Sequence, residues 1–518
     1  MKNAAGREIP TSLSGYKDII PYAGAFATRP PAGQRHWGRL AKAAYPHDNN
    51  KVLASIEEAI DASGLKDGMT VSFHHGLRNG DYVMNMVMLA IQKKGIKNLT
   101  LAPSSFLNSN DALIPLFKDG TIVDAQTSGL RSELGHFLTM NKLTRPTIVR
   151  PHGGRARAIE NGELKIDVMF LAAPIADIYG NITGVLGSAA CGSMGYAMVD
   201  AKFADTVVAV TDNLVDHPIC PVSIPQYMVD FIVRVDAIGD PKGIATGALR
   251  GSKNPRDLNM AKMAAQIVEH AGYFKEGFAM QLGAGAAAVS TGLYLRDLML
   301  RDKIIAGMAI GGIVGAFCDL LDEGLIRTMF DTQSFDDRTI KSLRDNPRHQ
   351  EYDCGNYANP WNKGAMVNKL DYVILGATEV DINFNVNVLT DSNGIMMGAL
   401  GGHPDASAGA KCTIITVPLL RGRLPMVTDS VQTVSTPGET VDVIVTERGI
   451  AVNPNRQDLM DNLKGTGLPI KPIEELRDMA CALSGGKPEP LKLSDQITAV
   501  IEYRDGTVLD VIRSPIVE

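Results

Sequence analysis

Short apolar runs alternate with longer amphipathic segments from about residue 50 onward. Runs of four or five residues rich in Val, Ile and Leu are typical of buried strands, whereas apolar positions repeating every 3.6 residues indicate helices. The alternation predicts an α/β fold in which parallel-rich sheets are flanked by helices. The expected strands lie at 70–73, 99–102, 168–172, 207–210, 279–282, 372–375, 413–417 and 441–445, and the expected helices at 51–63, 82–94, 258–271 and 312–323.

One pattern of aspartate and asparagine occurs twice along the chain. Asp167 opens an apolar strand, Asp177 follows ten positions later, and Asn181 follows four positions after that. Residues 371–385 repeat both aspartates and the asparagine at the same spacing. Because several features recur in the same order, we interpret the chain as a duplicated unit. The other shared features are the glycine-ended strands 71–76 and 280–285 and the Val-Asp strands that begin at Val229 and Val441.

The duplication predicts two homologous domains, at 51–236 and 257–518, joined by a linker at 237–256 that is rich in glycine, alanine and charge. Residues 1–50 have no counterpart in the second copy, and we expect them to form an arm that packs on a partner subunit. Residues 497–512 alternate apolar and polar positions around Asp-Gly, which predicts a hairpin at the end of the second domain.

Composition excludes several classes of protein. A length of 518 residues with 45% hydrophobic and 21% charged residues is typical of a globular protein of two to four domains. The net charge of -6 and the lack of a basic run argue against nucleic acid as a partner. The six cysteines form no CxxC pair, and no HxxxH, HExxH or EF-hand pattern occurs, so we expect no metal site and no disulfide framework.

Neither a signal peptide nor a membrane span is expected. The first twenty residues have no apolar core. The most apolar run, 304–318, is shorter than the roughly 20 residues of a spanning helix and is better explained by a buried strand, a Gly-Gly turn and a packed helix. Together with the reduced thiols, these features favour a cytoplasmic protein.

Several motifs resemble signatures of the CoA-transferase superfamily, and a further set narrows the resemblance to citrate lyase alpha subunits. The resemblance covers roughly residues 50–518 and is specific only through the combination of motifs. The superfamily motifs are KIDVMFLAAPIADIYGNITG (165–184), ATEVDINFNVN (377–387), GALGGHPDASAGAK (398–411) and VDVIVTERGIAVNP (441–454). The narrower set is DGMTVSFHHG (67–76), TSGLR (127–131), HGGR (152–155), NPRDL (254–258), GYFKEGF (272–278), QSFD (333–336) and FNVNVLT (384–390).

The resemblance implies two CoA-transferase-like domains and a transferase that converts citrate and acetyl-acyl carrier protein into citryl-acyl carrier protein and acetate. The carrier thiol would be a CoA-derived group on a small gamma subunit. A separate beta subunit would cleave the citryl thioester. We therefore expect no cofactor bound covalently to this chain, and we expect citrate and those two subunits as partners.

Glu379 is the first candidate catalytic residue. It follows a second-domain strand, whereas the matching position in the first copy is Ile175. In related CoA-transferases this glutamate becomes a glutamyl-CoA thioester, because a positioned carboxylate can act as a nucleophile. Citrate lyase alpha subunits are instead thought to react through a ternary complex and a mixed anhydride. Both mechanisms remain open at this point, and so does a purely structural salt bridge.

Two glycine-bearing loops are candidates for binding the thioester. Gly401 and Gly402 lie in a loop whose backbone N–H groups are able to converge on a developing oxyanion. Gly283, Ala284 and Gly285 join a strand to a helix, which suits a phosphate or a pantetheine amide at the helix N-terminus. The run 283–288 also fits a dinucleotide fingerprint, but no acidic residue follows at the required distance, so NAD is disfavoured.

Citrate carries three carboxylates, and its pocket therefore requires fixed donors such as arginine. Three arginines lie beside glycine in loops of the first domain, and two histidines neighbour the first of them. Nothing in the spacing selects among these citrate-binding candidates, which are Arg78, Arg131, Arg155, His74 and His75.

Other functions are compatible with the same scaffold. An acetyl-CoA hydrolase or acetate CoA-transferase is the main alternative, and the first-domain motifs FHHG, TSGLR and HGGR argue against it. A non-catalytic scaffold subunit is the alternative of another class, and the retention of Glu379 and both glycine loops argues against that. A sugar-phosphate isomerase of similar topology is more distant. Fold alone does not separate these functions.

Overall fold

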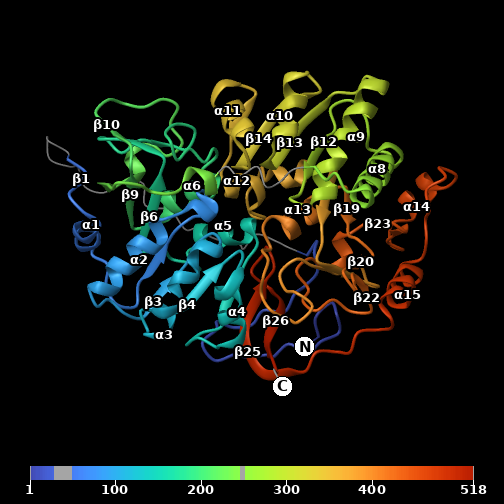
Figure 1. The fold of residues 1–518 in the computed structure, drawn as a ribbon, viewed down its shortest axis with the longest axis horizontal. Coiled ribbons are helices and arrows are strands. Elements are labelled where there is room, and N and C mark those ends of the chain that lie inside the picture. Colours follow the sequence, from blue (N-terminus) through green and yellow to red (C-terminus); the bar gives the residue numbers. More distant parts are fainter. Residues whose placement is uncertain (1, 28–49, 245–250, 517–518) are drawn as a thin grey trace.

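Two large sheets form the two halves of the molecule, which lie side by side in Figure 1. The computed structural model describes residues 2–27, 50–244 and 251–516. The first sheet has ten strands, all parallel except the last. Their order is β1 (Val52–Leu53), β11 (Phe231–Arg234), β9 (Thr206–Thr211), β6 (Val168–Ala173), β2 (Thr70–Ser72), β3 (Leu99–Leu101), β4 (Ile122–Thr127), β5 (Thr147–Val149), β25 (Leu493–Glu502) and β26 (Val508–Pro515).

The second sheet has eight strands, again parallel with one exception at the edge, β24. Both sheets carry helices, as Figure 1 shows, so the predicted α/β fold with two related parallel-rich halves is confirmed. The strand order is β15 (His349–Glu351), β14 (Ile326–Ser334), β13 (Ala306–Ile313), β12 (Ala279–Leu282), β16 (Tyr372–Gly376), β19 (Cys412–Thr416), β23 (Val443–Thr446) and β24 (Gly449–Val452).

Local sequence explains where the helices begin. Residues 51–63 were expected to be one helix, but Val52 and Leu53 form the edge strand β1. The helix α1 (Ile56–Ser63) begins later because the Ser55 side chain caps it by accepting from the N–H of Glu58, and Gly64 ends it in the left-handed conformation. The other helices that matter below are α4 (Ser132–Met140), α5 (His152–Glu160), α6 (Gly195–Phe203) and α9 (Ala286–Asp302).

The apolar run 304–318 divides as expected into the buried strand β13 and the helix α10 (Gly315–Asp322). The helix predicted from residue 312 begins at 315 because β13 continues to Ile313. No helix within the described residues is long and apolar enough to cross a membrane.

The repeated Asp-Asn motif folds in the same way in both halves. The strand-opening aspartates accept a backbone N–H from the neighbouring strand, Thr70 to Asp167 and Ala279 to Asp371, each at 2.8 Å. The second aspartate of each copy ties its own loop together, because its carboxylate accepts the N–H and the side-chain amide of the asparagine four positions on. The two halves therefore share hydrogen bonds as well as topology.

Each motif belongs to a small three-stranded sheet. Asp177 ends β7 (Ile175–Asp177), which pairs with β8 (Ile182–Thr183) and β10 (Leu214–Val215). Asp381 ends β17 (Glu379–Asp381), which pairs in the same two directions with β18 (Val386–Asn387) and β22 (Val427–Thr428).

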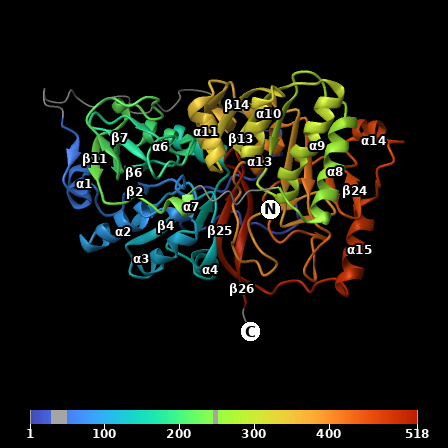
Figure 2. The same cartoon turned by 45° about the horizontal axis from the view of Figure 1, so that its top comes forward.

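The C-terminal hairpin lies with the first half, although its position in the sequence placed it with the second. Strand β25 adds in parallel to β5, and β26 pairs with β25. The hairpin is held by a buried ion pair in which Arg150 Nε lies 2.6 Å from a Glu502 carboxylate oxygen. Figure 2 shows the hairpin in red beside α4.

The described part of the N-terminal arm packs on its own chain. Pro21 bridges to Val508 of β26, and Tyr16 donates its hydroxyl to Glu502 at 2.5 Å. Arg7 joins the hairpin to the second half, because it pairs with Asp510 and donates to the carbonyl of Val431 at 2.5 Å. Residues 28–49 of the predicted arm and 245–250 of the predicted linker lie outside the described residues.

We expect Asp381→Ala to destabilise the second half. The change leaves the N–H groups of Asn383, Asn385 and Val431 without their carboxylate acceptor, because all three donate to Asp381. Unsatisfied buried donors cost about 1–3 kcal/mol each, so a total of about 3 kcal/mol would lower Tm by about 6–12 °C. Differential scanning calorimetry measures this.

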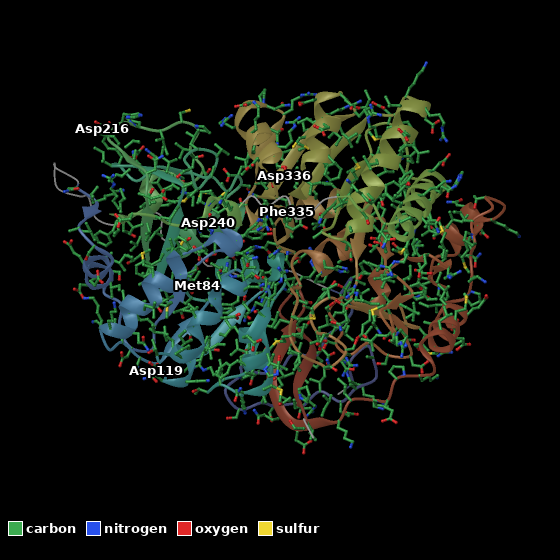
Figure 3. The ribbon with its side chains drawn as sticks, viewed as in Figure 1. Met84, Asp119, Asp216, Asp240, Phe335 and Asp336 are labelled. Atoms are coloured by element: carbon green, nitrogen blue, oxygen red, sulfur yellow. The ribbon has the colours of Figure 1, made fainter. Side chains whose placement is uncertain are left out.

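The matched control for this variant is Asp216→Ala. Its side chain is 93% exposed and lies at the outer rim of the first half (Figure 3), so its Tm should stay within about 2 °C of the wild type. A fall in Tm for Asp381→Ala no larger than that of the control would contradict the role assigned to the motif.

Candidate functional site: a cavity between the halves

A cavity of about 540 Å³ lies where the carboxyl ends of strands from both sheets face each other. This is the usual ligand position in open α/β sheets, because the loops that follow parallel strands meet there. The first half contributes side chains that follow β2 to β5, among them His75, Arg78, Ser105, Arg131 and His152. The second half contributes glycine-bearing loops together with polar and aromatic side chains such as those of Gln281, Tyr357 and His403. Its small residues at the cavity include Gly283, Ala284, Gly285, Gly376, Gly401 and Gly402.

The charge of the cavity comes from Arg78 and Arg131. Arg78 is fixed across the two halves, because it donates to the carbonyl of Ser334 at 3.0 Å and lies 4.4 Å above the ring of Phe335. Figure 3 places Phe335 where the halves meet. Burial lowers the pKa of Arg78 to about 10, which leaves it protonated at neutral pH. Arg131 stands at the N-cap position of α4, where its side chain is exposed and partial desolvation lowers its pKa.

No aspartate or glutamate is among the described residues that line the cavity, and neither arginine forms an ion pair within the described chain. Arg78 is half-buried and Arg131 is exposed, and because no carboxylate of the described cavity wall neutralises them, the two guanidinium groups favour an anion in the cavity. The shape and the charge together suit a small molecule with more than one carboxylate.

Three histidines line the cavity, and all are held neutral. Burial lowers the pKa of His75 well below its usual value, that of His152 to about 3 and that of His403 to about 4. Both ring nitrogens of His403 are bound, Nδ1 to the Thr436 hydroxyl at 2.7 Å and Nε2 to the Gly376 carbonyl at 3.1 Å. His403 therefore supports the loops, while His75 and His152 remain available to a ligand.

Both loops that line the cavity require glycine, because a side chain at one position of each would clash with neighbouring residues. A Cβ at Gly402 would lie 2.4 Å from the Tyr357 hydroxyl, and a Cβ at Gly283 would lie 2.8 Å from Leu375. Gly401 has a φ of +54°. Its carbonyl accepts the N–H of His152 at 2.8 Å, so the loop is tied to the first half. Gly285 is the N-cap of the long helix α9, whose first-turn N–H groups face this end of the molecule.

Two of the predicted citrate-binding candidates do not line the cavity. Arg155 is buried in an ion pair, with two of its nitrogens 2.7 Å from the Asp200 carboxylate and a further bond to the Ala102 carbonyl. His74 lies behind the wall, where burial lowers its pKa to about 4. The structure thus brings Arg78, Arg131 and His75 together and assigns Arg155 to packing.

Glu379 lies beside the cavity but not in its wall. It opens β17, and its neighbour Thr378 lines the cavity whereas Glu379 does not. Its carboxylate accepts the Asn387 side-chain amide at 3.0 Å and the backbone N–H of Gln432. Burial raises its pKa. The predicted nucleophile is therefore engaged in holding the loop at residue 432.

The sequence reasoning missed several cavity residues. His152 was quoted within the HGGR motif without a role, and its position directly after a strand was the available signal. Tyr196 and Tyr357 had no signal, because they come from elements distant in the sequence, whereas the position of Gln281 within the glycine-ended strand 280–285 was an available signal. Within the described ranges, no three His, Cys, Asp or Glu side chains gather as metal ligands would.

Comparison with known proteins gives consistent matches. A family model described as citrate lyase, alpha subunit, matches residues 49–515. The citrate lyase alpha chain of Klebsiella pneumoniae is 49% identical over 495 residues, which is 96% of each chain. That of Escherichia coli K12 is 47% identical over 464 residues, 90% of this chain and 91% of the relative.

Solved structures agree with these matches. A putative alpha subunit of citrate lyase from Streptococcus mutans, solved in complex with citrate, superposes with a TM-score of 0.92 at 48% identity and covers 95% of this chain and 96% of its own. A malonate decarboxylase hetero-tetramer from Pseudomonas superposes with a TM-score of 0.63 at 15% identity, covering 87% and 85%, and shows the shared fold alone.

Proposed function

This chain belongs to the citrate lyase alpha-subunit family, and we propose that its cavity transfers the carrier thiol of acetyl-acyl carrier protein, or of acetyl-CoA, to citrate. The products are acetate and the citryl thioester. The observation that carries the proposal is the cavity itself, in which two guanidinium groups face no described carboxylate. It is built to receive a polyanion and to keep a thioester beside it.

Citrate fits the wall that the first half provides. Arg78 and Arg131 each offer a guanidinium, which pairs with a carboxylate through two parallel hydrogen bonds. His75, Ser105 and Asn79 add neutral donors on the same wall. A monocarboxylate such as acetate would neutralise only one of the two cations, so the charge of the cavity favours citrate over acetate as the acceptor.

The thioester fits the opposite wall. The loop formed by Gly283, Ala284 and Gly285 leads into α9, and its backbone is exposed to the cavity for contact with pantetheine amides. Gly401 and Gly402 present N–H groups for which no backbone acceptor occurs among the described residues. We assign these two N–H groups to the oxyanion that forms when the thioester carbonyl is attacked.

The reaction proceeds through a mixed anhydride, without a covalent intermediate between substrate and enzyme. A citrate carboxylate oxygen attacks the acetyl carbon, the carbon–sulfur bond breaks, and the thiolate leaves with the bonding electrons to give an acetyl-citrate anhydride. The thiolate then attacks the citrate acyl carbon, and acetate leaves. Positioning replaces a bimolecular encounter in both steps. Because the described cavity wall has no carboxylate, this route is favoured over a glutamyl thioester.

Membership of the citrate lyase alpha-subunit family also supports a proposal about the subunits with which this chain assembles. We propose that a small acyl carrier subunit delivers its CoA-derived thiol to the cavity and that a second subunit cleaves the citryl thioester within one cytoplasmic complex. The six cysteines of the chain are all free thiols, which is compatible with a reducing compartment.

We expect the purified chain to transfer the CoA of acetyl-CoA, used as a surrogate for the carrier, to citrate far faster than to acetate or succinate. The positive charges of Arg78 and Arg131 account for this preference. Release of acetate and formation of citryl-CoA, followed by mass spectrometry, measure it. Preference for acetate would indicate an acetate CoA-transferase, hydrolysis in water alone would indicate a hydrolase, and no turnover would favour a scaffold subunit.

In the same assay, Arg131→Gln should raise KM for citrate about 10- to 100-fold, because one charge-assisted bond of about 1.5–3 kcal/mol is lost. KM for acetyl-CoA should change little. The control is Arg296→Gln, an exposed arginine that pairs with Glu323 on the surface. An unchanged citrate KM for Arg131→Gln would exclude Arg131 from the citrate site.

The third prediction from this site concerns Glu379. We expect Glu379→Gln to retain transfer within about tenfold, since Gln keeps the shape that holds the loop and no acyl group passes through the residue. Hydroxylamine or borohydride added during turnover should leave the wild-type residue unmodified by mass spectrometry. A trapped derivative at Glu379, or loss of transfer in the variant with normal citrate binding, would establish a covalent role instead.

A further inference from the structure

Two imidazole rings and a phenol ring pack together on the citrate wall of the cavity. The ring of Tyr196 lies 4.7 Å from that of His75 and 4.3 Å from that of His152, and the two imidazoles are nearly parallel at 6.1 Å. All three side chains line the cavity. They come from α6 and from the segments that follow β2 and β5, so the fold assembles the group from distant parts of the first half.

The tautomer of His75 follows from its hydrogen bonds. Ser104 Oγ accepts the backbone N–H of His75 at 3.0 Å and lies 2.6 Å from His75 Nδ1. The hydroxyl hydrogen of Ser104 has no other acceptor within the described chain, so it donates to Nδ1. The ring proton is then on Nε2, and that N–H is left for a ligand.

His152 is arranged in a similar way. Its Nδ1 is buried without a partner among the described residues. Because an orphaned N–H is rarer in proteins than an orphaned acceptor, the proton is better placed on Nε2. That nitrogen would lie 3.6 Å from a Cβ on Gly401, which puts it next to the oxyanion loop. The main-chain N–H of His152 meanwhile holds the Gly401 carbonyl at 2.8 Å.

On the basis of the function proposed above, we propose that His75 and His152 hold the reacting carboxylate of citrate through two neutral Nε2–H donors, while Arg78 and Arg131 hold the other two carboxylates. The assignment matches three carboxylates to three sets of donors on one wall. It also places the reacting carboxylate beside Gly401, where the thioester carbonyl is to be attacked.

Neutral donors suit this reaction because neither step moves a proton. The citrate carboxylate attacks as an anion and the thiolate leaves as an anion, and in the second step the thiolate attacks and acetate leaves. A guanidinium on the reacting carboxylate would neutralise its charge and weaken the nucleophile, whereas an imidazole N–H orients it with less neutralisation. Both imidazoles also remain to stabilise the oxyanion on the citrate carbon in the second step.

The surroundings keep these rings neutral across the working pH range. Burial is the main cause of the lowered pKa of His75, and electrostatic interactions with its neighbours, His152, Arg78, His74 and Arg131, act in the same direction. For His152 the neighbouring cation is Arg155. With the pKa of His152 lowered to about 3, protonation would begin only well below pH 6.

The experiment compares alanine with glutamine at position 152, because a glutamine amide is able to place an N–H near the former Nε2. His152→Ala should lower kcat for acetyl-CoA and citrate about 100-fold, with KM for citrate changed less than about threefold. His152→Gln should recover kcat to within about tenfold of the wild type. The bond from the main chain to Gly401 persists in both variants, so the oxyanion loop is undisturbed.

Three outcomes would overturn the proposal: glutamine as slow as alanine, a raised citrate KM with normal kcat, or a wild-type acid limb near pH 6.5 that the glutamine variant loses. The last result would mean that the imidazole transfers a proton. If His152→Ala does not fold, the same comparison at His75 replaces it. His217→Gln, an exposed histidine outside the cavity, is the control and should match the wild type. A wild-type chain that binds citrate without transferring to it would contradict the proposed function itself.

Discussion

Two guanidinium groups at the cavity, half-buried Arg78 and exposed Arg131, form no ion pair among the described residues, and they determine which ligand the cavity favours. Elsewhere in its interior the chain pairs its cations, Arg155 with Asp200 and Arg150 with Glu502, because an isolated buried charge is strongly unfavourable. Arg78 and Arg131 differ, because they retain contact with solvent and no carboxylate of the described residues lines the cavity beside them, so an anionic ligand is able to pair with both. The cavity between the two halves therefore favours ligands that carry more than one negative charge.

The duplication gives the cavity two related walls, and the two copies contribute different residues to them. Both copies use the same Asp-Asn loop to brace the carboxyl ends of their strands, so both present loops toward the shared space. Both cavity arginines come from the first copy, and the glycine loops at 283–285 and 401–402 come from the second. The first half therefore supplies the cations that attract a carboxylate substrate, whereas the second supplies the loops that allow close approach to backbone amides.

Sequence predicted the features that depend on local pattern and did not predict those that depend on long-range packing. The strands, the repeat and both glycine loops could be located because periodicity and glycine carry local information. Arg131 and Arg155 looked equivalent, each next to glycine, and only the packing of α6 against Arg155 through Asp200 separates them. The position of Glu379 beside the cavity depends on its contacts with Asn387 and the distant Gln432, which the sequence pattern does not contain.

The docking of the hairpin has a consequence for the order of assembly during synthesis. Strand β5 is the edge of the first sheet until β25 pairs with it, and more than half of the sequence lies between the two. As the chain leaves the ribosome, the first half thus waits with an open edge while the whole second half is made. The first sheet is therefore completed only after the second half has been synthesised, so both walls of the cavity reach their final structure at the same stage.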